Sequence, residues 1–144
     1  LGKLEILQND AGTFNGRLND VKLSFFKYPY PLLFKPLSFK GVNIAHVFDI
    51  ACMKIVAISE RGTKRDFIDL YFICQTSPLD EMFKLFRKKY QLVKYNIIHI
   101  LKSLVYFEDA ENDPEPQMIE KVDWEEIKNF FEKEAVRLGK KYLR

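Results

Sequence analysis

One stretch of the sequence decides the fold, DIACMKIVAISERGTKRDFIDLYFI, residues 49–73. The pattern predicts one helix over 45–59 and a second over 64–75, which ends before Pro78. Gly62 is well placed to end the first helix, because glycine readily adopts the left-handed conformation that helix ends favour. A connection this short makes the two helices antiparallel neighbours.

Two charged residues occupy apolar positions of these helices. Lys54 is the only charge within 50–58, and Asp69 is the only charge within 67–73. At 100° per residue the neighbours of Lys54 one turn away are all apolar: Val47, Ile50, Ala51, Ala57 and Ile58. Burying either ion alone would cost several kcal/mol, on the order of 3–5, so each needs a partner. We therefore expect Lys54 to face Asp69 between the helices.

Further charges extend this pair into a possible polyphosphate site. Arg61 lies on the same side of the first helix as Lys54, and Arg65 and Asp66 flank the start of the second. The lysine and arginines would hold a nucleotide's phosphates and stabilise charge during transfer. Asp69 would orient Lys54 or accept a proton. The alternative is an ion pair that only locks two helices together.

The motif in this stretch is D-x-x-x-x-K-x-x-A-I-x-x-R-G-x-x-R-D-F-x-D-L-Y, residues 49–71. It resembles the lysine-centred motif of AbiEii/AbiGii-type nucleotidyltransferase toxins, the toxin halves of bacterial toxin–antitoxin and phage-defence pairs. Residues 21–30, VKLSFFKYPY, resemble the strand-to-loop entry of that family, and residues 122–128, VDWEEIK, resemble its final helix. The resemblance thus covers most of the chain, although only the motif is specific.

The resemblance implies a catalytic role for Lys54 and Asp69, and nucleotide binding by Lys54, Arg61, Arg65 and Asp66. It also implies a nucleoside triphosphate (NTP) with Mg²⁺, an acceptor such as tRNA, and a cognate antitoxin. The alternative is a helical module without catalysis that binds an antitoxin or RNA.

The chain departs from the family at its metal site. The family opens with a Gly-Ser or Gly-Gly turn and an Asp-x-Asp pair that holds the metal. Residues 1–38 lack both, since Asp10 and Asp20 lie ten residues apart in turns, and the chain starts at Leu1. We expect the C-terminal part of a nucleotidyltransferase, inactive alone, whose metal-binding half lies upstream or was lost. No metal ligand is assigned, and His46 and His99 lack the spacing of a zinc site.

The rest of the chain predicts an α+β fold, a small antiparallel sheet followed by a bundle of about five helices. We expect residues 1–40 to form a β meander and a Pro-rich connection, which the resemblance implies are part of a partial nucleotidyltransferase core, and residues 41–144 to form the helical part. Prolines exclude regular structure through about residue 39. The remaining expected elements are helices over 79–90 and 93–107, a solvated acidic loop over 108–116, and a last helix from Asp123 with a capping-box-like Glu126.

Basic and aromatic residues alternate in the third predicted helix. Lys84, Arg87, Lys88 and Lys89 are expected on its outer face, a composition that suits an RNA backbone. The same pattern fits an ordinary helix with a solvated face.

Composition restricts the remaining classes. Thirteen Phe and seven Tyr exclude a disordered tail, and a net charge of +3 excludes a purely electrostatic nucleic-acid arm. Cys52 and Cys74 form no CxxC pair, and no apolar stretch approaches the roughly 20 residues that span a bilayer. We therefore expect a cytoplasmic protein.

Overall fold

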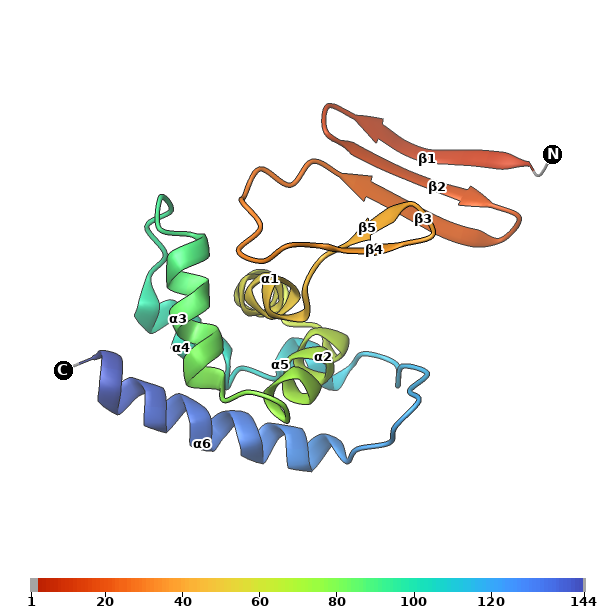
Figure 1. The fold of residues 1–144 in the computed structure, drawn as a ribbon. Helices are drawn as coiled ribbons and strands as arrows, with labels where there is room; N and C mark the ends of the chain where they lie inside the picture. The colour runs from red at the N-terminus through yellow and green to blue at the C-terminus, as the bar shows by residue number, and fades with distance from the viewer. Residues whose placement is uncertain (1–2, 144) are drawn as a thin grey trace. The chain divides into compact units, whose positions relative to one another are not determined.

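The structure, a computed structural model, describes residues 3–143, which divide after Pro31 into two compact units. The first unit is an antiparallel sheet of β1 (Leu4–Asp10), β2 (Thr13–Leu18) and β3 (Val21–Phe26), in that order (Figure 1). Asn19 and Asp20 both have positive φ, 48° and 67°, as a tight hairpin turn between β2 and β3 requires. The predicted meander is confirmed.

The second unit begins with a short hairpin that the sequence analysis missed. β4 (Leu37–Phe39) pairs with β5 (Val42–Ile44) through a turn at Lys40 and Gly41, whose φ angles are 48° and 79°. The prediction of no regular structure through residue 39 was therefore wrong. The proline at position 36 directly precedes β4, so it removes no hydrogen bond from the ladder.

Within the described residues 3–143, six helices follow, and α1 packs against α2, α3 and α4 (Figure 1). Their bounds are α1 (Val47–Glu60), α2 (Lys64–Cys74), α3 (Leu79–Lys89), α4 (Ile97–Ser103), α5 (Glu108–Glu111) and α6 (Trp124–Tyr142). Because α5 is a single turn, the expected α+β fold with about five helices is confirmed. The acidic segment predicted as a loop contains α5.

Aromatic side chains hold α6 onto α2. The buried ring of Phe67 lies 5.3 Å from that of Phe131 and 5.9 Å from that of Trp124, centre to centre. Asp123 caps α6 by accepting a hydrogen bond from the Glu125 amide, so the predicted start is confirmed. Glu126, predicted to complete a capping box, accepts a hydrogen bond from the Tyr71 hydroxyl and thereby ties α6 to α2.

A buried ion pair joins α1 to α3. Lys89 Nζ lies 2.6 Å from Asp49 Oδ1, and both side chains are fully buried. The expected position of Lys89 on the outer face of α3 was wrong, because Lys89 follows Met82 and Phe86 at helical spacing on the inner side. Burial raises the pKa of Asp49, but hydrogen bonds from Lys89 and from the Leu33 and Phe34 amides outweigh it and lower the pKa overall.

The predicted turn at Gly62 is present between α1 and α2. Gly62 has a φ of +52°, and its amide donates a hydrogen bond to the Ala57 carbonyl at 3.1 Å. A Cβ at this position would lie 3.3 Å from the Ile58 carbonyl oxygen. Only glycine therefore fits without strain, and this turn sets how α2 follows α1.

We expect Gly62→Ala to lower the free energy of unfolding by about 1–2 kcal/mol, because the left-handed conformation strains any residue with a Cβ. Gly139→Ala is the matched control. Gly139 lies within α6, where a Cβ would meet nothing within 4 Å, so this change should raise stability by about 0.5–1 kcal/mol. Urea denaturation of the two variants measures both effects, and a loss of the same size in both would contradict the assignment.

Candidate functional site

Lys54 bridges two carboxylates where α1 packs against α2. Its Nζ lies 2.6 Å from Asp69 Oδ2 and 3.0 Å from Asp66 Oδ1, and its side chain is 20% exposed. The expected contact between Lys54 and Asp69 is confirmed. The structure adds Asp66 to this contact, so the Lys54 ammonium group forms ion pairs with two carboxylates of α2.

Asp66 is the buried centre of the cluster. It accepts hydrogen bonds from Arg61 Nε at 3.0 Å, Arg61 Nη2 at 3.2 Å, Thr63 Oγ1 at 2.6 Å and Lys54 Nζ at 3.0 Å. Burial raises the pKa of Asp66, but the hydrogen bonds from Arg61, Thr63 and Lys54 outweigh it and lower the pKa overall. Asp66 therefore stays ionised, with both oxygens occupied by protein donors, and is poorly placed to accept a proton.

Lys54 remains an ammonium at neutral pH. Burial lowers its pKa, but the hydrogen bonds to Asp69 and Asp66 raise it by more. The pKa of Arg61 is also raised, chiefly by its hydrogen bonds to Asp66. The side chain of Asp69 is 43% exposed, against 1% for Asp66. Asp69 is therefore the carboxylate of this cluster that a ligand can reach.

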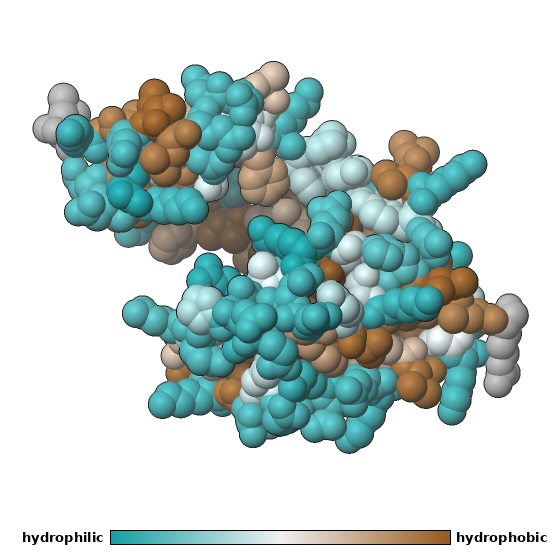
Figure 2. Space-filling view, turned by 180° about the vertical axis from the view of Figure 1, so that it is seen from behind, coloured by the Kyte–Doolittle hydropathy of each residue, from teal (hydrophilic) through white to brown (hydrophobic). Residues whose placement is uncertain are grey.

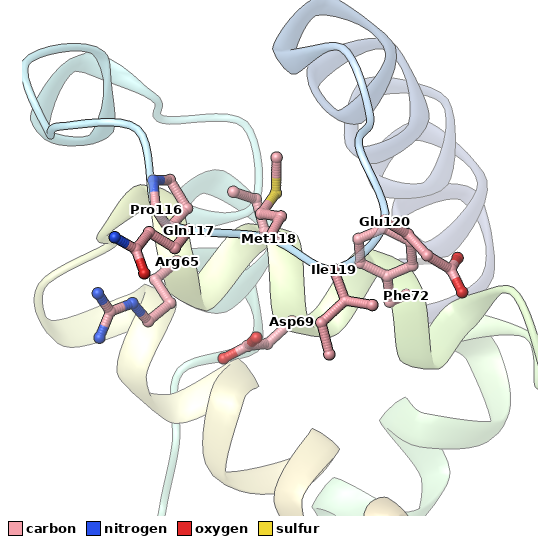
Figure 3. Close-up of a pocket in the computed structure, with 9 residues that line it drawn as sticks. Arg65, Asp69, Phe72, Pro116, Gln117, Met118, Ile119 and Glu120 are labelled. Atoms are coloured by element: carbon pink, nitrogen blue, oxygen red, sulfur yellow. The ribbon is translucent and has the colours of Figure 1, made fainter.

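Two pockets adjoin the cluster, and Arg65 and Pro116 line both. The cationic pocket, about 410 Å³, is lined by Lys54, Arg61, Thr63, Arg65, Asp66, Asp113, Pro114 and Pro116. The apolar pocket, about 420 Å³, is lined by Arg65, Ile68, Asp69, Phe72 and residues 116–120 (Figure 3). Arg65 is exposed and forms no ion pair within residues 3–143. All five residues predicted for the site therefore line one or both pockets.

The acidic segment after α5 folds back onto the start of α2. The Lys64 amide donates to Asp113 Oδ2 at 2.8 Å, and Lys64 Nζ lies 2.8 Å from Glu115 Oε1. The prediction of a solvated loop was wrong for Asp113, which is half-buried, whereas the Glu115 side chain is 68% exposed although it pairs with Lys64. Asp113 satisfies one of the helix-end amides that were expected to favour a bound anion. No local sequence signal reveals this contact, because its partners are 49 positions apart in the sequence.

The residues predicted to contact RNA differ in their burial and in their partners. Lys84 pairs with Asp80 at 3.2 Å, and the Arg87 guanidinium lies 5.5 Å from the centre of the Tyr142 ring. Lys88 is exposed, whereas Lys89 is buried in the pair with Asp49 and cannot contact RNA. A separate groove of about 570 Å³ runs beside this helix end, lined by basic and aromatic residues among others: Arg87, Lys88, Tyr90, Lys94 and Tyr95.

Comparison with known proteins identifies the family. The model of the nucleotidyl transferase AbiEii toxin family, of type IV toxin–antitoxin systems, matches residues 20–137, which include the whole cluster. The chain belongs to the AbiEii nucleotidyl transferase toxin family. An uncharacterized protein of Aquifex aeolicus (strain VF5) is 42% identical over 151 residues, covering 99% of this chain and 68% of the relative. No solved structure matches the chain.

Membership of the AbiEii family implies use of an NTP and a metal ion. Residues 3–143 contain no group of three or more His, Cys, Asp or Glu placed to hold a metal. The carboxylates of the cluster instead neutralise Lys54 and Arg61. These residues therefore do not fit a divalent cation. Across the described part of the chain, none of the helices is both long and apolar enough to cross a bilayer.

The two acids of the cluster should differ in their effect on stability. Asp66→Asn should lower the free energy of unfolding by about 2–4 kcal/mol, because two cations lose a buried partner. Asp69→Asn, the matched control on the same helix, should cost less than about 1 kcal/mol, since exposed pairs contribute little. Urea denaturation at pH 7 measures both. Equal losses would contradict the division into a buried and an accessible acid.

Comparison of Asp66→Asn with the wild type also tests a pH dependence. The pKa of Asp66 is lowered in the folded chain, so its stabilisation is present above its unfolded value of 3.8 and is lost as pH falls through the folded value. Between about pH 5 and pH 2 the wild type should therefore lose more stability than Asp66→Asn. A parallel loss in both proteins would show that Asp66 is not the titrating group.

Proposed function

We propose that the cationic pocket binds the triphosphate of an NTP, as part of an enzyme that transfers a nucleoside monophosphate to an acceptor such as tRNA. The observation that carries this proposal is the group of three cations around one pocket, Lys54, Arg61 and Arg65, of which Arg65 forms no ion pair among the described residues. Cations positioned in this way bind phosphates and stabilise the charge that develops during transfer.

Lys54 can turn toward a phosphate without unfolding the cluster. When Lys54 leaves Asp69, Asp66 still holds Arg61 and Thr63, so no buried acid loses all its partners. The lost pair with Asp69 is partly exposed and contributes little, about 0–1 kcal/mol. A triphosphate carries more negative charge than one carboxylate, and it can therefore replace Asp69 as the partner of Lys54.

The transfer itself makes and breaks one bond each at the α-phosphorus. The acceptor hydroxyl oxygen bonds to the α-phosphorus, and the bond from that phosphorus to the oxygen bridging the β-phosphate breaks. Pyrophosphate leaves with the electron pair, and Lys54 and Arg61 stabilise its charge. Once Lys54 pairs with the phosphates, Asp69 is released and, at 43% exposure, is accessible to take the hydroxyl proton.

Mg²⁺ would supply further charge neutralisation on the phosphates, but the described residues provide no ligand set for it. We therefore propose that this chain binds the NTP and does not transfer nucleotides alone. Metal-dependent labelling of RNA by the chain, detected with an NTP radiolabelled at the α-phosphate, would contradict this part of the proposal.

An NTP should raise the melting temperature of the chain by several degrees. Ligand at a hundredfold excess over its Kd adds about 2.7 kcal/mol to the free energy of unfolding. Thermal shift with ATP, GTP, CTP and UTP, each with and without Mg²⁺, measures the effect. Lys54→Met should abolish it, because the phosphates lose their central cation.

Lys128→Met is the matched control for Lys54→Met. Lys128 is 19% exposed and bridges Glu111 and Glu125 at 2.8 and 2.6 Å, much as Lys54 bridges its two acids. This variant should keep the full nucleotide shift. If all four NTPs leave the melting temperature of the wild type unchanged, the proposal fails.

The alternative function is a non-catalytic module that binds an antitoxin. It is favoured by the first unit, whose sheet leaves large apolar side chains exposed: Leu4, Ile6, Leu7, Leu18, Val21, Phe25 and Phe26. Figure 2 shows hydrophobic side chains at the surface near the N-terminal strands. Exposed apolar surface of this kind is typical of protein interfaces. Binding of the antitoxin without any effect of NTPs would favour this alternative.

RNA contact is supported by the groove beside the end of α3, where Lys88 and Lys94 lie among tyrosines. We expect Lys88→Glu/Lys94→Glu to weaken tRNA binding at least several-fold and to reduce its salt dependence, because two phosphate contacts are reversed in charge. Electrophoretic mobility shift at several salt concentrations measures this effect.

Lys22→Glu/Lys27→Glu is the charge-matched control, because both lysines are exposed and lie in the first unit. It changes the net charge by the same amount and should leave tRNA binding less affected. If both double variants weaken binding equally, net charge rather than this groove accounts for it.

A further inference from the structure

We infer that the apolar pocket holds the nucleobase of the NTP whose triphosphate occupies the cationic pocket, an inference that rests on the proposed function. The two pockets are adjacent, since Arg65 and Pro116 line both. A nucleotide is built in the same way, with an anionic chain at one end and a flat, largely apolar ring system at the other. The order of the pockets along α2 matches this arrangement.

Apolar side chains provide the surface on which a base would lie. Phe72 and Ile68 come from α2, and Met118 and Ile119 come from the irregular segment that passes over it (Figure 3). Ile119 is fully exposed although it borders the pocket. Aromatic side chains stack on any of the bases, because every base has a π-face. Aliphatic side chains pack against the same flat, largely apolar faces.

Polar groups lie among these apolar contacts, as they do in most small-molecule sites. Gln117 carries both a donor and an acceptor in its amide, and Glu120 carries acceptors only. Both lie on the segment with Met118 and Ile119, and Figure 3 places Gln117 on the Arg65 side and Glu120 on the Phe72 side. Such groups can hydrogen-bond to the edge of a base.

Arg65 marks the border between the two ends of the ligand. Its guanidinium is planar and permanently charged, so it can pair with a phosphate or stack on a ring. It forms no ion pair within the described residues, unlike Lys54 and Arg61. We therefore place the junction of base, sugar and first phosphate at Arg65.

Comparison of an NTP with inorganic tripolyphosphate tests the inference, because tripolyphosphate has the anionic chain and no base. Isothermal titration of the full chain should show at least one of ATP, GTP, CTP and UTP binding about tenfold or more tightly than tripolyphosphate. Met118→Ser/Ile119→Ser should reduce that NTP to nearly the affinity of tripolyphosphate and leave tripolyphosphate binding unchanged.

Leu92→Ser is the control, since Leu92 is almost as exposed as Ile119 and lines neither pocket. It should leave both affinities unchanged. Lys54→Met should weaken NTP and tripolyphosphate alike, because it acts on the phosphates.

The outcomes of these measurements distinguish failure of the base site from failure of the phosphate site. Equal affinity of the wild type for tripolyphosphate and all four NTPs would overturn the base site while supporting the phosphate site. Unchanged NTP binding in Met118→Ser/Ile119→Ser would do the same. Absence of binding by every ligand would overturn the proposed function and the base site together.

Discussion

The buried carboxylate of Asp66 is the constraint on which the site depends. An ionised acid in the interior requires several donors, and here they come from Lys54 of α1 and from Arg61 and Thr63, which flank the turn between the helices. The glycine turn between the helices brings these donors within reach. The hydrogen bonds to Asp66 therefore stabilise the helix pair and, at the same time, hold Lys54 and Arg61 at the cationic pocket.

Two of the lysine–aspartate pairs among residues 3–143, Lys89–Asp49 and Lys54–Asp69, differ in burial, and this difference decides which of them a ligand could replace. Lys89 and Asp49 are fully buried, and removal of either partner would leave an uncompensated charge at a cost of about 3–5 kcal/mol. Lys54 and Asp69 are partly exposed, where a pair contributes about 0–1 kcal/mol. The proposed triphosphate site therefore requires only an exchange of the exposed partner of Lys54, whereas the partner of Lys89 must remain in place.

The sequence predicts the centre of the site better than its surroundings. Helical periodicity places Lys54 opposite Asp69, because both interrupt apolar faces of helices joined by one short turn. Lys89 was misassigned, because it ends a helix with basic residues on both faces and only tertiary packing shows which are inside. Asp113 was missed because its contact with Lys64 joins segments far apart in the sequence. The hairpin at residues 37–44 was missed because its strands are only three residues long.

The division between phosphate and base has a consequence for specificity. All NTPs share the triphosphate, so Lys54, Arg61 and Arg65 alone cannot distinguish one nucleotide from another. Discrimination requires contacts with the base, and in the proposed base site most of the lining, residues 116–120, lies outside the motif at residues 49–71. The irregular backbone of that segment leaves its side chains free of the spacing that a helix imposes. In the proposed site, substitutions there change which base fits without disturbing the hydrogen bonds of Asp66, so nucleotide choice and the stability of the proposed phosphate site are physically separable.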